Sequence, residues 1–160
     1  MTIISVQNLE VMFNTDDGII TAVDDVSFEI KEGEVMGLVG ESGSGKSVTA
    51  KSLMQLNPSN TIYGEKSNIR LKNGDEELDV LSLKRGREMV VLRGGAISMI
   101  FQEPMASFAP AITIGNQMVE QLLIHTSMSK RQAFELSVEM LDKVGINEPE
   151  KRFYQYSFEL

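Results

Sequence analysis

The stretch LVGESGSGKSVTA, residues 38–50, decides the fold class of this chain. Residues 40–47 fit the pattern G-x-x-x-x-G-K-[ST], which is typical of loops that bind nucleotide phosphates. The alternative is a flexible Gly/Ser turn before a helix. However, the stretch follows an apolar run and leads into a helical pattern, which is the context that the phosphate-binding pattern requires. The sequence therefore predicts a phosphate-binding loop between a buried strand and a helix.

Each residue type in this loop has a chemical reason. Glycines let the backbone turn tightly and point successive N–H groups at one anion. The following helix adds the free N–H groups of its first turn and the positive end of its dipole. Lys46 supplies a positive charge for the β- and γ-phosphates, and the Ser47 hydroxyl is suited to ligate Mg²⁺. The predicted nucleotide-binding residues of the loop are Gly40, Glu41, Ser42, Gly43, Ser44, Gly45, Lys46, Ser47 and Val48.

The composition excludes several classes of function. The chain has 160 residues, near the size of one domain, and a formal net charge of −8. This charge argues against a general nucleic-acid binder, which needs a basic face. The sequence has no cysteine, so it offers no disulfide partner, thiol nucleophile or cysteine-ligated metal. No apolar run approaches the roughly 20 residues of a membrane helix, and we expect no signal peptide.

The hydrophobic pattern predicts strands on both sides of the loop. Residues 3–13, 19–23 and 26–30 are rich in Ile and Val and predict three antiparallel strands separated by turn-forming clusters. Residues 35–40 and 96–101 are continuous apolar runs, as expected for strands that are buried on both faces of a parallel sheet.

Helical patterns account for much of the remainder. We predict helices at about 46–56 and 83–93, with small strands and loops at 59–82. A third helix begins after Thr113, a suitable N-cap.

A fourth helix begins at a capping box formed by Ser129 and Gln132, and it ends at Gly145. Its predicted apolar face consists of Ala133, Leu136, Met140, Leu141 and Val144.

Over nearly its whole length, the sequence resembles the ATP-binding subunits of ABC transporters. AVDDVSFEIKEGEVMGLVGESGSGKSVT, residues 22–49, is similar to the family's opening segment, which leads into the Walker A loop. ISMIFQEPMASFAPAITIGNQMVEQL, residues 97–122, is similar to its Q-loop region, although SFAPAIT departs from the usual SLNP wording. GESGSGKSVT and MIFQEPM most resemble the subfamily that powers uptake of oligopeptides, dipeptides and nickel.

The resemblance implies an α/β P-loop NTPase fold of ABC type, of which the chain carries a portion of one ATPase domain. We expect an antiparallel β subdomain at 1–34, part of a parallel core sheet with the loop and its helix at 35–101, and the Q-loop with the start of the helical subdomain at 102–160. In the family, the Walker A and Q-loop strands share one sheet without being neighbours. We therefore expect residues 35–39 and 98–101 to lack their usual ladder partners here.

Two further site residues are implied by the resemblance alone. Gln102 matches the Q-loop glutamine, which in the family reaches Mg²⁺ and the attacking water and senses the γ-phosphate. Taken alone, a solvated side chain before Pro104 is the favoured interpretation, but the surrounding MIFQEPM favours the functional one. Lys46 and Gln102 would thus have supporting catalytic roles. Phe13 lies where the family places an aromatic that stacks on adenine, but a core Phe fits the sequence as well.

Other polar residues are interpreted without catalytic roles. His125 is the sole histidine, and we interpret it as a surface or helix-end residue. The adjacent carboxylates at 16–17, 24–25 and 76–77 are interpreted as solvated faces.

The resemblance also implies what residues 1–160 do not contain. In the family, a phrase like FYQYSFEL, residues 153–160, precedes the signature motif, the Walker B Asp with its catalytic Glu, and the switch His. None of these motifs occurs in this sequence. We therefore expect the 160-residue chain to hold ATP without hydrolysing it, while a full-length parent does both.

The resulting functional expectation is an ATPase with ATP and Mg²⁺ as cofactors that powers import of peptides or similar small solutes. Its expected partners are a second ATPase subunit and an integral-membrane permease, which contacts the region after Gln102. The expected location is cytoplasmic, peripheral on the inner face of the cell membrane. Two alternatives remain open: a non-transport ABC ATPase, and a nucleotide-binding module without catalysis.

Overall fold

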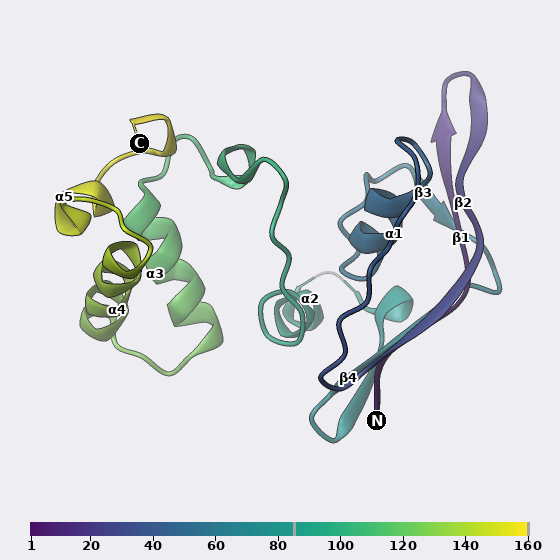
Figure 1. The fold of residues 1–160 in the computed structure, drawn as a ribbon, viewed down its shortest axis with the longest axis horizontal. Helices are drawn as coiled ribbons and strands as arrows, with labels where there is room; N and C mark the ends of the chain where they lie inside the picture. Colours follow the sequence, from purple (N-terminus) through teal and green to yellow (C-terminus); the bar gives the residue numbers. More distant parts are fainter. Residues whose placement is uncertain (85, 160) are drawn as a thin grey trace. The chain divides into compact units, whose positions relative to one another are not determined.

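The computed structural model describes residues 1–84 and 86–159 and divides them into two compact units, Met1–Ile97 and Ser98–Leu160 (Figure 1). The first unit contains the antiparallel sheet and the phosphate-binding loop, and the second is helical. None of the helices in these described residues has the length and apolarity needed to cross a membrane.

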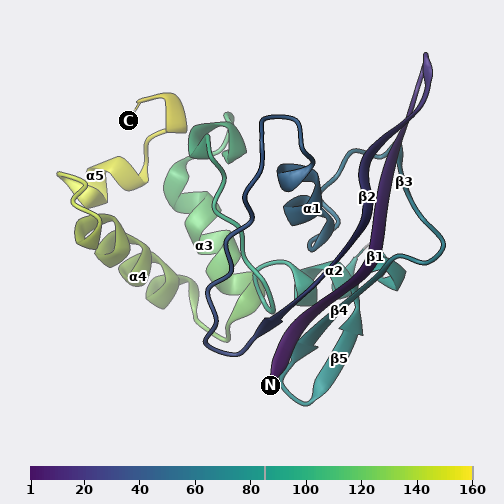
Figure 2. The ribbon, with the colours of Figure 1, turned by 45° about the vertical axis from the view of Figure 1, so that its right-hand side comes forward.

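The first unit is built on one antiparallel sheet, whose long hairpin is seen in Figure 1 and whose short strands are clearer in Figure 2. Its path order is β2-β1-β4-β5, and β3 also pairs with β1. The sheet extends past the 1–34 region expected to form the β subdomain. The strands are β1 (Thr2–Thr15), β2 (Gly18–Lys31), β3 (Thr61–Tyr63), β4 (Asn68–Asn73) and β5 (Glu76–Asp79).

The prediction of two strands at 19–23 and 26–30 is wrong, because β2 is one continuous strand. The register between β1 and β2 shifts near Asn8 and Asp25, which both adopt left-handed φ angles of 47° and 48°. Asn8 Nδ2 donates a hydrogen bond of 2.8 Å to Asp25 Oδ1. The acidic pair therefore belongs to an irregularity within the strand, where a short polar side chain can support the unusual backbone.

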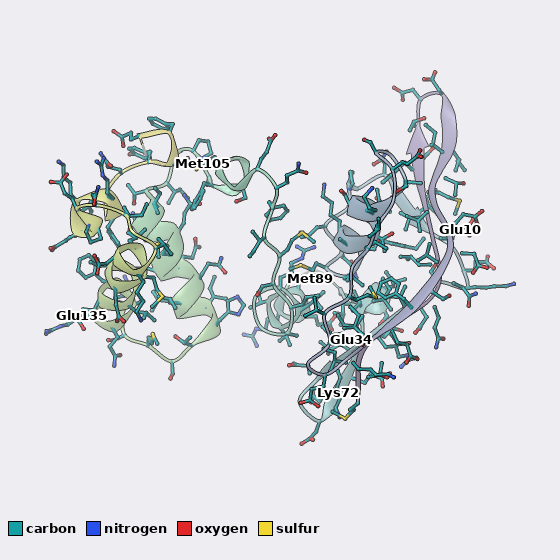
Figure 3. The ribbon with its side chains drawn as sticks, in the orientation of Figure 1. Glu10, Glu34, Lys72, Met89, Met105 and Glu135 are labelled. Atoms are coloured by element: carbon teal, nitrogen blue, oxygen red, sulfur yellow. The ribbon has the colours of Figure 1, made fainter. Side chains whose placement is uncertain are left out.

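The core of the first unit lies between the sheet and two short helices. Ile4, Val6, Leu9 and Val11 alternate toward this core from β1, with the bulge resetting the period. Helix α2 (Arg87–Leu92) contributes Met89, labelled in Figure 3, and the fully buried Leu92. Helix α1 (Lys46–Ser52), which follows the loop, contacts β1 and β2. Both helices are shorter than predicted.

The two apolar runs predicted as core strands are not strands in this structure. Val35 and Val39 are 97% and 93% exposed, and Ile100 is 97% exposed. Within the described residues, the runs have no ladder; Ile97 makes only an isolated parallel bridge to Arg93. The strand prediction at 35–40 and 96–101 is therefore wrong for this chain, whereas the expectation that these segments lack ladder partners is confirmed. A central strand needs neighbours to accept and donate its backbone hydrogen bonds.

The second unit packs its helices around a small core of Ile114, Leu141 and Phe153. Gly115 is required at the contact between α3 (Ile114–His125) and α5 (Pro149–Phe153), because a Cβ atom there would lie 2.2 Å from the Phe153 ring. The elements are η2 (Pro104–Ser107), α3 (Ile114–His125), α4 (Lys130–Lys143), α5 (Pro149–Phe153) and η3 (Ser157–Glu159).

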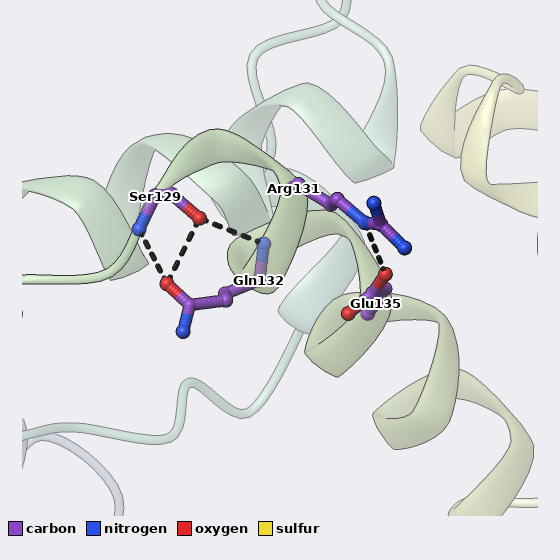
Figure 4. A network of polar contacts seen from close by, with 4 residues as sticks. All are labelled: Ser129, Arg131, Gln132 and Glu135. Carbon is purple, nitrogen blue, oxygen red and sulfur yellow. Dashed lines mark hydrogen bonds and ion pairs between the residues drawn. The ribbon is translucent and has the colours of Figure 1, made fainter.

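The predicted capping box at the start of α4 is confirmed (Figure 4). Ser129 N donates to Gln132 Oε1 at 2.9 Å, and Gln132 N donates to Ser129 Oγ at 3.3 Å. Four of the five predicted apolar-face residues are buried or half-buried. Val144 is the exception at 75% exposed, because α4 ends at Lys143 and Val144 is already the C-cap.

Candidate phosphate-binding site

The loop between residues 40 and 48 enters α1 through two glycines with left-handed backbone. Gly43 has φ +83° and Gly45 has φ +86°, and Gly45 is the N-cap of α1. Left-handed φ angles are strained for residues with a Cβ atom. The fixed Gly45 of the sequence pattern is therefore explained by backbone geometry as well as by phosphate chemistry.

Gly45 also brings the loop against the sheet. A Cβ atom at Gly45 would lie 2.5 Å from the Ala22 carbonyl oxygen of β2, and 3.1 Å from Val23 Cγ2. At the other end of the loop, a Cβ atom at Gly40 would lie 2.6 Å from Ser44 Oγ. The loop thus forms a cradle that added side-chain atoms would fill, and β2 supports it from one side.

The Lys46 ammonium lies over the loop's own acceptors. Lys46 Nζ donates to Gly40 O at 2.8 Å, to Glu41 O at 2.5 Å and to Ser44 Oγ at 3.2 Å. An ammonium has three N–H donors, so these contacts use its full capacity. Phosphate oxygens are charged acceptors and make stronger hydrogen bonds to an ammonium than carbonyl oxygens do. The lysine is therefore positioned to exchange loop oxygens for phosphate oxygens.

A small cavity adjoins this loop. Its volume is about 160 Å³. The N–H groups of the first turn of α1 have no acceptor within the helix, and Ser47 presents its hydroxyl on the exposed surface. A phosphate group fits this donor set, and the hydroxyl is suited to a hard cation such as Mg²⁺. The cavity is lined by Ala22, Gly43, Ser44, Gly45, Lys46, Ser47 and Val48.

A larger hollow on the same unit has the wrong chemistry for phosphate. It measures about 460 Å³ and is lined mainly by carboxylates, which repel an anion. Its lining residues are Asn8, Glu10, Asp24, Asp25, Glu65 and Lys66. Of these two hollows, the larger therefore has the less suitable chemistry, and the donor groups favour the loop as the phosphate site.

The other two predicted site residues belong to elements other than the loop and α1. Phe13 is on β1, where it pairs with Ile20 of β2 and Thr61 of β3, and it packs half-buried against the first core. Gln102 is exposed and belongs to the second unit. Residues 40–48 thus come together within one unit, while the roles of Phe13 and Gln102 stay predictions.

The residues interpreted as non-catalytic are located as follows. His125 is the last residue of α3. The paired carboxylates at 16–17, 24–25 and 76–77 are all exposed. Ala22 was not anticipated as a site residue, because it contributes a backbone carbonyl and a cavity wall rather than a reactive side chain.

Comparison with known families fits this geometry. The family model described as ABC transporter matches residues 23–159. The chain belongs to the ABC transporter family. The match includes the complete loop at 40–48 and the region around Gln102.

Curated relatives include peptide-transport ATP-binding proteins of this family. The chain is 46% identical over 157 residues to the oligopeptide transport ATP-binding protein OppD of Salmonella typhimurium, covering 98% of this chain and 45% of that protein. It is 44% identical over 154 residues to the dipeptide transport ATP-binding protein DppD of Bacillus subtilis, covering 96% and 44% respectively. The predicted resemblance to the oligopeptide and dipeptide subfamily is confirmed. The chain spans about 45% of the length of these relatives.

Solved structures support the fold class. A dimeric post-hydrolysis state of the ATP-binding cassette MJ0796, bound to ADP and Pi, superposes with a TM-score of 0.75 at 20% identity. The match covers 98% of this chain and 62% of that chain. The expected ABC-type α/β fold is thereby confirmed, even though the runs at 35–40 and 96–101 form no ladder here.

Proposed function

We propose that this chain binds the phosphates of ATP through residues 40–48 and belongs to an ATPase that powers import of peptides or similar small solutes. The observation that carries the proposal is the Lys46 ammonium over a glycine-supported loop at the start of α1. The similarity to OppD and DppD supports the peptide-import part.

Each loop residue has a defined part in holding the nucleotide. The backbone N–H groups of residues 43–48 bind phosphate oxygens, and Lys46 neutralises charge on the β- and γ-phosphates. Ser47 Oγ and the Gln102 side-chain oxygen would ligate Mg²⁺, which screens the phosphate charge when it is bound. Phe13 would stack on the adenine ring. These assignments make the loop the main source of affinity.

The proposal separates binding from hydrolysis. Phosphoryl transfer needs a group that orients the attacking water, in addition to charge stabilisation. Lys46, Ser47 and Gln102 supply the phosphate and metal contacts, but residues 1–160 contain no Walker B Asp-Glu pair after Gln102. We therefore propose that the 160-residue chain binds ATP without turnover, and that hydrolysis belongs to the longer parent.

The proposed assembly places two such ATPase subunits against a membrane permease, on the cytoplasmic face of the membrane. ATP binding would bring the subunits together, and hydrolysis would release them. The region after Gln102 would contact the permease. Co-purification of the full-length protein with a permease would favour this proposal over a non-transport ABC ATPase.

The test compares the wild-type chain with Lys46→Ala and with Lys51→Ala, a matched substitution on the same helix. Titration with a fluorescent ATP analogue plus Mg²⁺ should show about a hundredfold weaker binding for Lys46→Ala, because charge-assisted contacts are lost, and little change for Lys51→Ala. Phosphate release by the wild type should equal that of Lys46→Ala. Equal affinities in all three proteins would contradict the binding site, and steady release that only Lys46→Ala abolishes would contradict the assignment of turnover to the parent.

A further inference from the structure

A polar network fixes the end of α1 that lies opposite the phosphate-binding loop. Arg93 Nε donates to Met54 O at 2.9 Å, and Arg93 Nη2 donates to Gln55 O at 2.6 Å. Both carbonyls lie in the turn that follows the C-cap of α1. One guanidinium thus holds two successive carbonyl groups at the carboxyl end of the loop's helix.

Neighbouring side chains extend this network to other elements. The Gln55 side-chain amide donates to Val80 O of η1 (Val80–Ser82) and to Leu83 O. The Asn57 amide donates to Val48 O at 3.2 Å and Ser52 Oγ at 2.8 Å, within α1, and to the Tyr63 hydroxyl of β3 at 3.3 Å. The carboxyl end of α1 is therefore connected to the sheet and to the turn after β5.

A helix of this length depends on such anchors. Helix α1 covers only Lys46–Ser52, and isolated helices much shorter than about 12 residues are unstable in water. A cation at the carboxyl end also interacts favourably with the helix dipole. Among residues 1–84 and 86–159, no carboxylate forms an ion pair with Arg93, so its charge is directed at the carbonyls.

Arg93 also connects α1 to the segment that leads toward Gln102. It is the C-cap of α2, where its N–H donates to Met89 O at 2.8 Å, and it forms the isolated bridge to Ile97. The preceding residue, Leu92, is fully buried in the first core. The side chain of Arg93 therefore connects the core segment that contains the buried Leu92 to the carboxyl end of α1.

We propose that Arg93 is a positioning residue for the phosphate-binding loop. It fixes the carboxyl end of α1, and through this short helix it fixes the N–H groups of residues 45–48 that contact phosphate. The proposal rests on the proposed function of the loop. Arg93 itself makes no contact with the nucleotide in this scheme, so its effect is on affinity rather than on chemistry.

The test uses the full 160-residue chain and three substitutions at this position. Arg93→Met keeps the aliphatic stem without donors or charge, Arg93→Gln keeps a donor, and Arg93→Lys keeps the charge and a donor. Arg70→Met is the matched control, because Arg70 makes an exposed ion pair with Glu77 and an exposed hydrogen bond to Asn68, both on the sheet of the same unit. The folded fraction of each protein is measured by circular dichroism, and MgATP affinity is expressed per folded molecule.

Two readouts are expected to change together. Arg93→Met should bind MgATP about tenfold more weakly per folded molecule, and Arg93→Lys should recover most of this loss, because a half-buried hydrogen bond from a charged group is lost in one and kept in the other. Without added nucleotide, hydrogen exchange at residues 45–56 should accelerate in Arg93→Met, while exchange in β1 stays unchanged. Arg70→Met should match the wild type in both.

Several outcomes overturn the proposal. Wild-type affinity per folded molecule in Arg93→Met would show a purely structural role, as would a loss that Arg93→Lys does not recover. If Arg93→Met does not fold, Arg93→Gln and Arg93→Lys are compared in its place. If the wild type does not bind MgATP, the proposed function fails, and unchanged exchange at residues 45–56 would separately overturn the positioning role.

Discussion

The β1–β2 hairpin and the apolar run at 35–40 follow one another in the chain, yet they differ in almost every structural respect. Strand β1 has β2 along one edge and β3 and β4 along the other. The run at 35–40 is richer still in apolar residues, but no strand in the described part of the chain pairs with it. Its valines are among the most exposed apolar residues of the structure.

This difference shows that an apolar sequence pattern is not sufficient to form a buried strand. Burying a strand requires neighbours for its backbone N–H and C=O groups as well as a surface for its side chains. Strand β1 finds both within residues 1–73, because β2 follows it directly and β3 and β4 also lie in this part of the chain. A strand of a parallel sheet depends on partners that arrive over longer connections.

The largest expected contrast between the two regions is in hydrogen exchange. Amides of residues 35–40 should exchange at least about a thousandfold faster than those in the centre of β1, because they have no ladder while β1 opens only when the unit unfolds. Exchange followed by mass spectrometry on the intact chain measures both regions at once. Equal protection would mean that the run is paired in solution, and light scattering would then show whether a second copy supplies the strand.

A smaller contrast is expected in stability. Leu9→Ala should lower the free energy of unfolding by about 3 kcal/mol, because it opens a cavity in a fully buried position. Val39→Ala should change it by less than about 0.5 kcal/mol, because the side chain is exposed. Urea denaturation followed by circular dichroism measures both. Similar losses for the two variants would contradict the comparison.

The smallest expected difference is between alanine substitutions at two glycines of the loop, in their effects on stability and MgATP binding. Both Gly43 and Gly45 have left-handed φ angles, so alanine at either position should cost about 1–2 kcal/mol of stability. Gly45→Ala should cost more and weaken MgATP binding further, because its Cβ atom would clash with Ala22 O, whereas a Cβ at Gly43 meets open space. Thermal unfolding and nucleotide titration test this ranking. Equal effects would show that contact with β2 does not constrain the loop.

The features that could be predicted from the sequence are those specified by residues close together in the chain. The capping box of Ser129 and Gln132 depends on residues three apart, so the pattern contains all the information. The phosphate-binding loop is likewise specified by a short, contiguous motif, and its position between 40 and 48 needed no tertiary context.

What could not be predicted depends on distant partners. The acidic pair at 24–25 indicates a turn when taken alone, and only Asn8, from another strand, makes it part of a bulge. Arg93 followed by two glycines indicates the end of a helix. Its contact with the turn after α1 could not be predicted, because the acceptors are backbone carbonyls, which every residue has.

The contacts of Lys46 also determine whether its side chain loses conformational entropy when the chain folds or when phosphate binds. Fixing a long lysine side chain in one rotamer costs up to about 2 kcal/mol of conformational entropy. In this structure, Gly40 O, Glu41 O and Ser44 Oγ already hold the ammonium at the loop. Most of that rotamer freedom is therefore lost when the chain folds, so little of the loss has to be offset when a phosphate group arrives.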